Sequence, residues 1–71
     1  MTNTALLVEF IEKSGYKRSY IAQRLDLTPY GFANKVNNKS EFKASEINML
    51  CDLLHIDSPA DKEAVFFSTA G

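Results

Sequence analysis

The stretch Tyr20–Ser40, YIAQRLDLTPYGFANKVNNKS, decides the fold because it holds two short apolar stripes separated by a break. The first pattern consists of Tyr20, Ile21, Ala22 and Leu25, in which Ile21 and Leu25 have the four-residue spacing of a helix face. It breaks at Asp26, a residue type that tolerates left-handed backbone. Thr28 then resembles an N-cap and Pro29 a first helical residue, since proline lacks only an amide that is unpaired there. The sequence therefore predicts two helices and a tight turn over about 18–37.

Side chains within this segment fit a steep crossing of the two helices. Ala22 is small where the helix axes approach, and Leu27 fills the turn. Phe32 and Val36, four residues apart, anchor the second helix from its inner face. Two helices joined in this way present the second helix to the DNA major groove, so the segment predicts a helix-turn-helix. Its outward contact candidates are Pro29, Tyr30, Ala33 and Asn34, with Thr28 and Asn37 at the two ends.

A helix is also predicted before the quoted stretch. Either Asn3 or Thr4 can cap its first turn, and Gly15 supplies a left-handed stop. Its apolar stripe consists of Leu7, Phe10 and Ile11.

Two more helices are predicted after the quoted stretch. A polar loop from Asn37 to about Lys43 leads into a stripe with helical spacing made of Ile47, Leu50, Cys51 and Leu54. Ser58-Pro59 repeats the cap-then-proline signal, with Asp61 near the positive end of the helix dipole. No segment alternates long enough to demand a strand. We therefore predict an all-α domain of four helices plus a short fifth, with residues 1–71 forming one domain.

Composition limits the class of protein. The 71 residues provide one small core, and 45% apolar with 24% charged residues is ordinary for a globular chain. Apolar runs such as Ala5–Val8 are too short to span a bilayer, so no membrane partner is expected. A single cysteine, Cys51, excludes a disulfide within the chain and fits a reducing cytosol. We expect a cytoplasmic protein.

Charges are sorted along the chain although the net charge is only −1. The stretch from Lys13 to Lys43 holds seven basic and two acidic residues, while Glu9, Glu12 and the segment after Ala44 are acidic. The cations flank the predicted second helix of the pair, where they can neutralise phosphates or serve only solubility. The phosphate-contact candidates are Lys17, Arg18, Thr28, Lys35, Asn37, Lys39 and Lys43.

From about Leu6 to Ile56 the chain resembles the helix-turn-helix family of lambda repressor and Cro. IAQRLDLTPYGFANKV resembles the paired helices of that family, and INMLCDLLHI resembles its fourth helix. The ending DKEAVFFS is similar to small regulators of Gram-positive phages and prophages. The resemblance implies a phage-type transcriptional regulator in a bacterial cytoplasm that binds double-stranded operator DNA, typically as a homodimer.

The resemblance also implies residue roles. Arg18, Thr28 and Asn37 would touch phosphate, and the residues that would face bases are Tyr30, Ala33 and Asn34. The chain departs from the family at Asp26, where glycine is common, and at 29–31, where glutamine, serine or arginine are frequent. Only Asn34 has the amide geometry suited to adenine, although Lys35 is a possible guanine or phosphate donor.

Sparse base readers leave a second interpretation open. Some phage switches include a small helix-turn-helix antirepressor, a modulator of repression that binds the repressor protein and masks its DNA-reading surface. A tyrosine and a phenylalanine near a weakly charged helix start are typical of protein-binding surfaces. Tyr30 itself can contact a partner or pack on a neighbouring loop, and Asn34 can read a base or simply be solvated.

The remaining residues give no sign of catalysis. One histidine, one cysteine and the lack of a glycine-rich phosphate loop argue against an enzyme, a cofactor, a metal site or a small-molecule substrate. Cys51 is expected to be a structural thiol, and His55 to lie at the end of the fourth helix. The last apolar residues either close the core or, where exposed, form a dimer surface; they are Leu53, Val65, Phe66 and Phe67.

Overall fold

The computed structural model describes residues 1–68, and this part of the chain forms five α-helices and no strand. The helices are α1 (Thr4–Ser14), α2 (Arg18–Arg24), α3 (Pro29–Val36), α4 (Ala44–Leu54) and α5 (Pro59–Phe66). The prediction of an all-α chain with a short fifth helix is confirmed. None of the helices in residues 1–68 has the length and apolar character needed to cross a membrane.

Local capping sets the helix boundaries. Asn3, Thr28 and Ser58 cap α1, α3 and α5, each with a side-chain oxygen that accepts a hydrogen bond from an amide in the first turn. Gly15 ends α1 in the left-handed region, with a φ of 77°. Three other residues in the described range share this conformation, namely Asp26 (φ 60°), Asn38 (φ 65°) and His55 (φ 56°). The predicted helix starts and stops are therefore confirmed.

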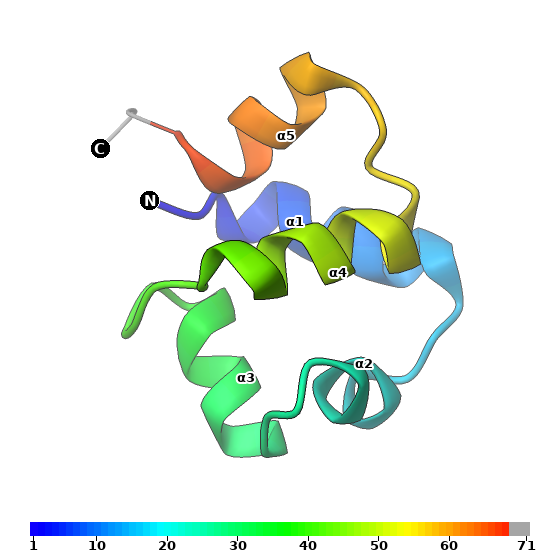
Figure 1. Cartoon of the computed structure of the whole chain (residues 1–71), viewed down its shortest axis with the longest axis vertical. Helices are drawn as coiled ribbons and strands as arrows, with labels where there is room; N and C mark the ends of the chain where they lie inside the picture. Colours follow the sequence, from blue (N-terminus) through cyan, green and yellow to red (C-terminus); the bar gives the residue numbers. More distant parts are fainter. Residues whose placement is uncertain (69–71) are drawn as a thin grey trace.

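The helices divide the molecule into two ends. Figure 1 shows α2 and α3 at one end and α5 at the other, with α1 and α4 between them. The core is centred on fully buried side chains from every helix and includes Leu7, Ile21, Phe32, Leu50, Ile56 and Val65. Phe42, in the connection between α3 and α4, joins the two ends because its ring centroid lies 6.2 Å from that of Phe32 and 5.9 Å from that of Phe66. This loop residue was not among the predicted core positions.

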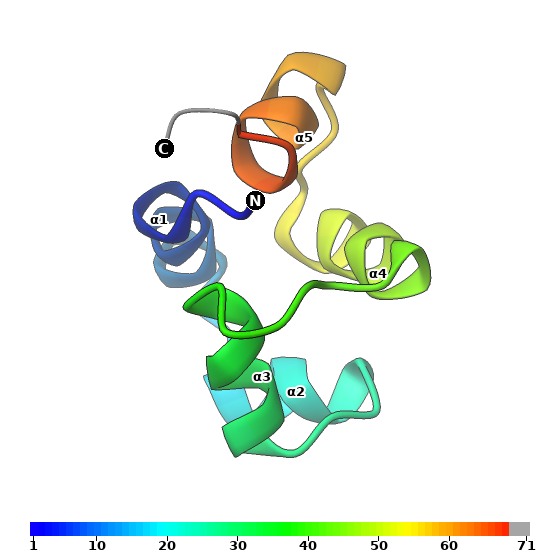
Figure 2. The same ribbon diagram turned by 90° about the vertical axis from the view of Figure 1, so that its left-hand side faces the viewer.

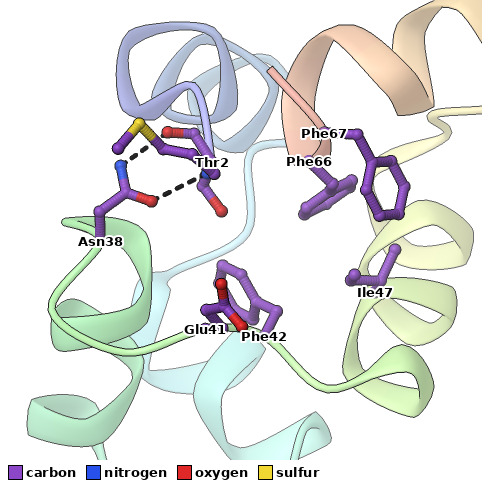
Figure 3. A pocket seen from close by; sticks show the side chains of 8 residues that line it. Thr2, Asn38, Glu41, Phe42, Ile47, Phe66 and Phe67 are labelled. Carbon is purple, nitrogen blue, oxygen red and sulfur yellow. Dashed lines mark hydrogen bonds between the residues drawn. The ribbon is translucent and has the colours of Figure 1, made fainter. Parts of the chain in front are cut away.

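The first residues of the chain tie α3 to α5. The Thr2 amide donates to Oδ1 of Asn38 at 2.8 Å, and Nδ2 of Asn38 donates to the Thr2 carbonyl at 2.7 Å, as Figure 3 shows. The Thr4 hydroxyl donates to the Val36 carbonyl at 2.6 Å. The Asn3 amide donates to the Val65 carbonyl at 2.7 Å. The Val36 and Val65 carbonyls, in the last turns of α3 and α5, thereby gain hydrogen-bond donors. The end of α3 is tied to the first residues of the chain.

Beside these bonds the surface has a small hollow of about 220 Å³ (Figure 3). Its lining consists of Met1, Thr2, Asn38, Glu41, Phe42, Ile47, Phe66 and Phe67.

The predicted dimer surface needs correction. Leu53, Val65 and Phe66 are buried within the chain, with exposures of 8%, 0% and 4%. They close the core because α5 packs back on α1. Phe67 alone remains exposed, at 57%. A surface built from all four residues is therefore wrong.

A largely buried ion pair joins α3 to the start of α4. Nζ of Lys35 lies 2.6 Å from Oε1 of Glu46, and the two side chains are 13% and 8% exposed. The Lys43 amide donates to the same oxygen at 2.8 Å. Burial alone would raise the pKa of Glu46, but the hydrogen bonds from Lys35 and Lys43 and the charges of both lysines outweigh it. The net result is a Glu46 pKa below its ordinary value of 4.5.

We predict that Glu46→Gln lowers the free energy of unfolding by about 3 kcal/mol at pH 7, because it leaves Lys35 buried without a counter-charge. Glutamine keeps the acceptor for the Lys43 amide, so the loss reports the charge. A folded-state pKa below 4.5 means that the stabilisation by Glu46 is complete above that pH and is lost as the pH falls through the lowered value. The difference between variant and wild type should therefore shrink in acid.

Urea unfolding at several pH values measures this difference. The matched control is Glu9→Gln, since the Glu9–Lys13 pair is exposed, at 60% and 74%, with 3.7 Å between its atoms. Its loss should stay below about 0.5 kcal/mol. A difference between Glu46→Gln and wild type that does not depend on pH would contradict the assignment.

Candidate nucleic-acid interface

The outer side of α3 is open to solvent. Tyr30 is 77% exposed and Pro29 is also exposed, whereas Ala33 and Asn34 are partly exposed. Phe32 and Val36 anchor the inner side, each 1% exposed. Figures 1 and 2 show α5 at the far end of the molecule, so it does not cover α3. The high exposure of Tyr30 also argues against the alternative that its ring packs on a neighbouring loop.

Residues 25–28 form the turn between α2 and α3. Asp26 adopts the left-handed conformation there, in the place where the resemblance led us to expect glycine. The Leu27 amide donates to the Ala22 carbonyl at 2.9 Å, and the Leu27 side chain packs partly buried against the core. Ala22 is fully buried, which lets α2 and α3 approach closely. The two helices cross steeply in Figure 2, so α3 projects away from α2.

The start of α3 is organised by Thr28 and Gly31. Oγ1 of Thr28 accepts a hydrogen bond from the Gly31 amide at 3.0 Å. A Cβ atom at position 31 would lie only 3.1 Å from that oxygen, so glycine leaves room for the cap. This departure from the family pattern therefore has a local cause. The Thr28 hydroxyl keeps its own proton and can donate it to an anion.

Four of the predicted phosphate-contacting cations are exposed: Lys17, Arg18, Lys39 and Lys43. Within residues 1–68 none of them forms an ion pair. Lys17 and Arg18 lie at the start of α2, which packs against α3, and the other two lie in the connection that leaves the end of α3. Asn37, the C-cap residue of α3, is exposed at that same end. Exposed cations therefore follow the end of α3 and stand at the start of the helix that packs against it.

Lys35 does not belong to this set, although it was predicted as a phosphate or guanine contact. Its side chain turns inward to Glu46 and is only 13% exposed. Reaching a phosphate would leave the Glu46 carboxylate buried without a partner, which is unfavourable. The prediction for Lys35 is therefore corrected to a structural role.

Sequence reasoning missed two polar residues on α2. Ser19 and Gln23 are exposed and border a shallow depression together with residues of the turn. That depression is lined by Ser19, Gln23, Asp26, Leu27, Thr28 and Pro29. Both residues lie opposite the buried stripe of α2, a helical-wheel signal that could have identified them. They extend the candidate interface from α3 onto the neighbouring side of α2.

Cys51 is buried in α4, and this burial raises the pKa of its thiol. A neutral buried thiol fits the expected structural role. Among residues 1–68 no group of three or more His, Cys, Asp or Glu side chains is arranged to hold a metal ion.

No protein-family model, curated protein or solved structure matches this chain.

We predict that Thr28→Ala lowers the free energy of unfolding by about 1 kcal/mol, because the first turn of α3 loses its cap. Thermal unfolding followed by circular dichroism measures the loss. Thr28→Ser is the matched control, since serine keeps the accepting hydroxyl and should remain close to the wild type. Equal losses in both variants would show that the methyl group, and not the cap, is responsible.

Proposed function

We propose that this chain is a transcriptional regulator of the lambda repressor and Cro type, which binds operator DNA by inserting α3 into the major groove. The observation that carries the proposal is the open outer side of α3, with exposed cations in the connection that follows α3 and at the start of the adjacent helix α2. In this reading α2, the turn and α3 act as a helix-turn-helix. The prophage or phage origin and the bacterial cytoplasm come from the sequence resemblance and form part of the proposal.

Each group on the interface has a role in the proposed complex. Asn34 pairs with an adenine edge through its amide, and the apolar surfaces of Pro29, Tyr30 and Ala33 contact thymine methyl groups. Phosphates are contacted by Lys17, Arg18, Thr28, Asn37, Lys39 and Lys43. Phosphate contacts fix the position of the protein on the duplex, and the base contacts supply sequence preference.

We predict that Asn34→Ala relaxes the preference at one base pair, at a cost of about 1 to 3 kcal/mol in operator affinity. Arg18→Ala should instead weaken binding to all duplexes alike, because a phosphate contact carries no sequence information. Selection from random duplexes followed by fluorescence anisotropy measures both effects. Lys62→Ala, an exposed cation on α5 at the far end, is the charge-matched control and should change neither. Identical small effects of Asn34→Ala and Arg18→Ala would argue against the docking.

We also predict that operator affinity falls steeply with salt. The logarithm of the association constant should decrease with the logarithm of salt concentration by about 0.9 per phosphate neutralised. Lys39→Ala and Lys43→Ala should each reduce that slope by about 1, and Lys62→Ala should leave it unchanged. Binding that does not respond to salt would rule out the phosphate contacts.

A second function, that of an antirepressor, is favoured by one observation. Lys35 is paired with Glu46, so Asn34 is the predicted base reader that remains on α3. The ring of Tyr30, 77% exposed, offers an apolar anchor for a protein. Under this alternative, adding the chain to a repressor–operator complex releases the operator, and the chain alone shifts no duplex. Tyr30→Ala should then abolish the release, whereas Arg18→Ala should have little effect. One gel-shift titration separates the two functions.

A further inference from the structure

A second exposed surface runs along the side of α2 that faces α4. It consists of two tyrosines, one arginine and one methionine, and we call it the Tyr–Arg strip: Tyr16, Tyr20, Arg24 and Met49. The tyrosines and the arginine are exposed, whereas Met49 is partly buried against the core. Tyr16 and Tyr20 are 41% and 38% exposed, and their ring centroids lie 5.2 Å apart at an angle of 35°. Large apolar side chains that remain this exposed are more informative than buried ones about what a surface binds.

Arg24 completes the strip and links it to α4. Its Nη1 donates to the Tyr20 hydroxyl at 3.0 Å, and its guanidinium carbon lies 5.9 Å from the centroid of that ring. Its Nη2 lies 3.9 Å from Sδ of Met49. These side chains hold one another in place before any partner arrives, which reduces the conformational entropy lost on binding.

The strip carries an uncompensated positive charge. No carboxylate in residues 1–68 lies within 4.0 Å of Arg24. The planar guanidinium retains further N–H donors in the fork geometry that suits a carboxylate. The chemistry of the strip is therefore cationic and aromatic, and it is complementary to an acidic group next to an apolar one.

The strip is separate from the proposed DNA face. On α2 the side bearing Ser19 and Gln23 borders the turn, whereas Tyr20 and Arg24 lie on the side next to Met49 of α4. No residue of the strip is among the residues proposed to contact bases or phosphates. A phosphate backbone could pair with Arg24 but has no apolar group to cover the two rings and the thioether. A protein segment can do both, and tyrosine and arginine are enriched in protein-binding hot spots.

We propose that the Tyr–Arg strip binds an acidic protein segment in which a carboxylate stands beside a large apolar side chain. The carboxylate pairs with Arg24, and the apolar side chain packs on Tyr16, Tyr20 and Met49. This site does not depend on the proposed function, because none of its residues belongs to the outer face of α3.

Selection of short random peptides displayed against the full-length chain tests the proposal. We expect enrichment of peptides with Asp or Glu close to Leu, Phe or Trp. A synthetic copy of an enriched peptide, labelled for fluorescence anisotropy, should bind Arg24→Ala at least about tenfold more weakly than wild type, as for a hot-spot residue. Tyr20→Phe, which keeps the ring and loses the hydroxyl that orients Arg24, should show a smaller loss. Lys62→Ala should bind as wild type does.

Three outcomes would overturn the proposal: no enriched peptide, enriched peptides without a carboxylate, or equal peptide binding by wild type and Arg24→Ala. Duplex binding by the same variants separates the strip from DNA recognition. Arg24→Ala should bind duplex as wild type does, whereas Arg18→Ala should not. A parallel loss of duplex affinity in Arg24→Ala would assign the strip to nucleic acid instead. Thermal unfolding of each variant confirms that the fold is retained.

Discussion

The ion pair between Lys35 and Glu46 is the interaction on which the presentation of α3 depends. An eight-residue helix has little stability of its own, so its direction must come from tertiary contacts. Phe32 and Val36 fix which side of α3 faces the core, and the ion pair fixes that side against the start of α4. The same carboxylate accepts a hydrogen bond from the amide of Lys43, the N-cap residue of α4. Glu46 therefore caps the start of α4 and also pairs with Lys35 of α3.

The ion pair removes the charge of Lys35 from the positive charge available at the surface near α3. The sequence from Lys13 to Lys43 is strongly basic, but one of its lysines is neutralised inside the molecule and another, Lys13, pairs with Glu9. The surface field near α3 therefore comes from the cations at the start of α2 and in the connection to α4. These groups lie outside α3, at the start of α2 and in the connection that follows α3.

How far the sequence predicted the structure depends on the range of each interaction. The caps at Asn3, Thr28 and Ser58 act within a few residues, so the helix boundaries could be read directly. The tie between Asn38 and Thr2 spans 36 positions, and the pairing of Lys35 with Glu46 spans 11. Neither contact follows from helical periodicity, because each depends on how two segments that are distant in the sequence are oriented in the fold. The structure shows most of the predicted contact residues exposed or partly exposed, but it turns Lys35 inward because a carboxylate distant in the sequence decides its direction.

The short helix α2 shows how a small domain can separate several tasks. After Arg18, which begins the helix, its other six residues divide into a buried side at Ile21 and Ala22, a side along the turn at Ser19 and Gln23, and a side along α4 at Tyr20 and Arg24. The second and third sides do not share a residue. Any coupling between them would have to pass through the packing of α2 itself, and it would be equal in both directions. If the proposed docking on both sides holds, an acidic protein bound to the Tyr–Arg strip would travel with the chain to its operator without competing for α3.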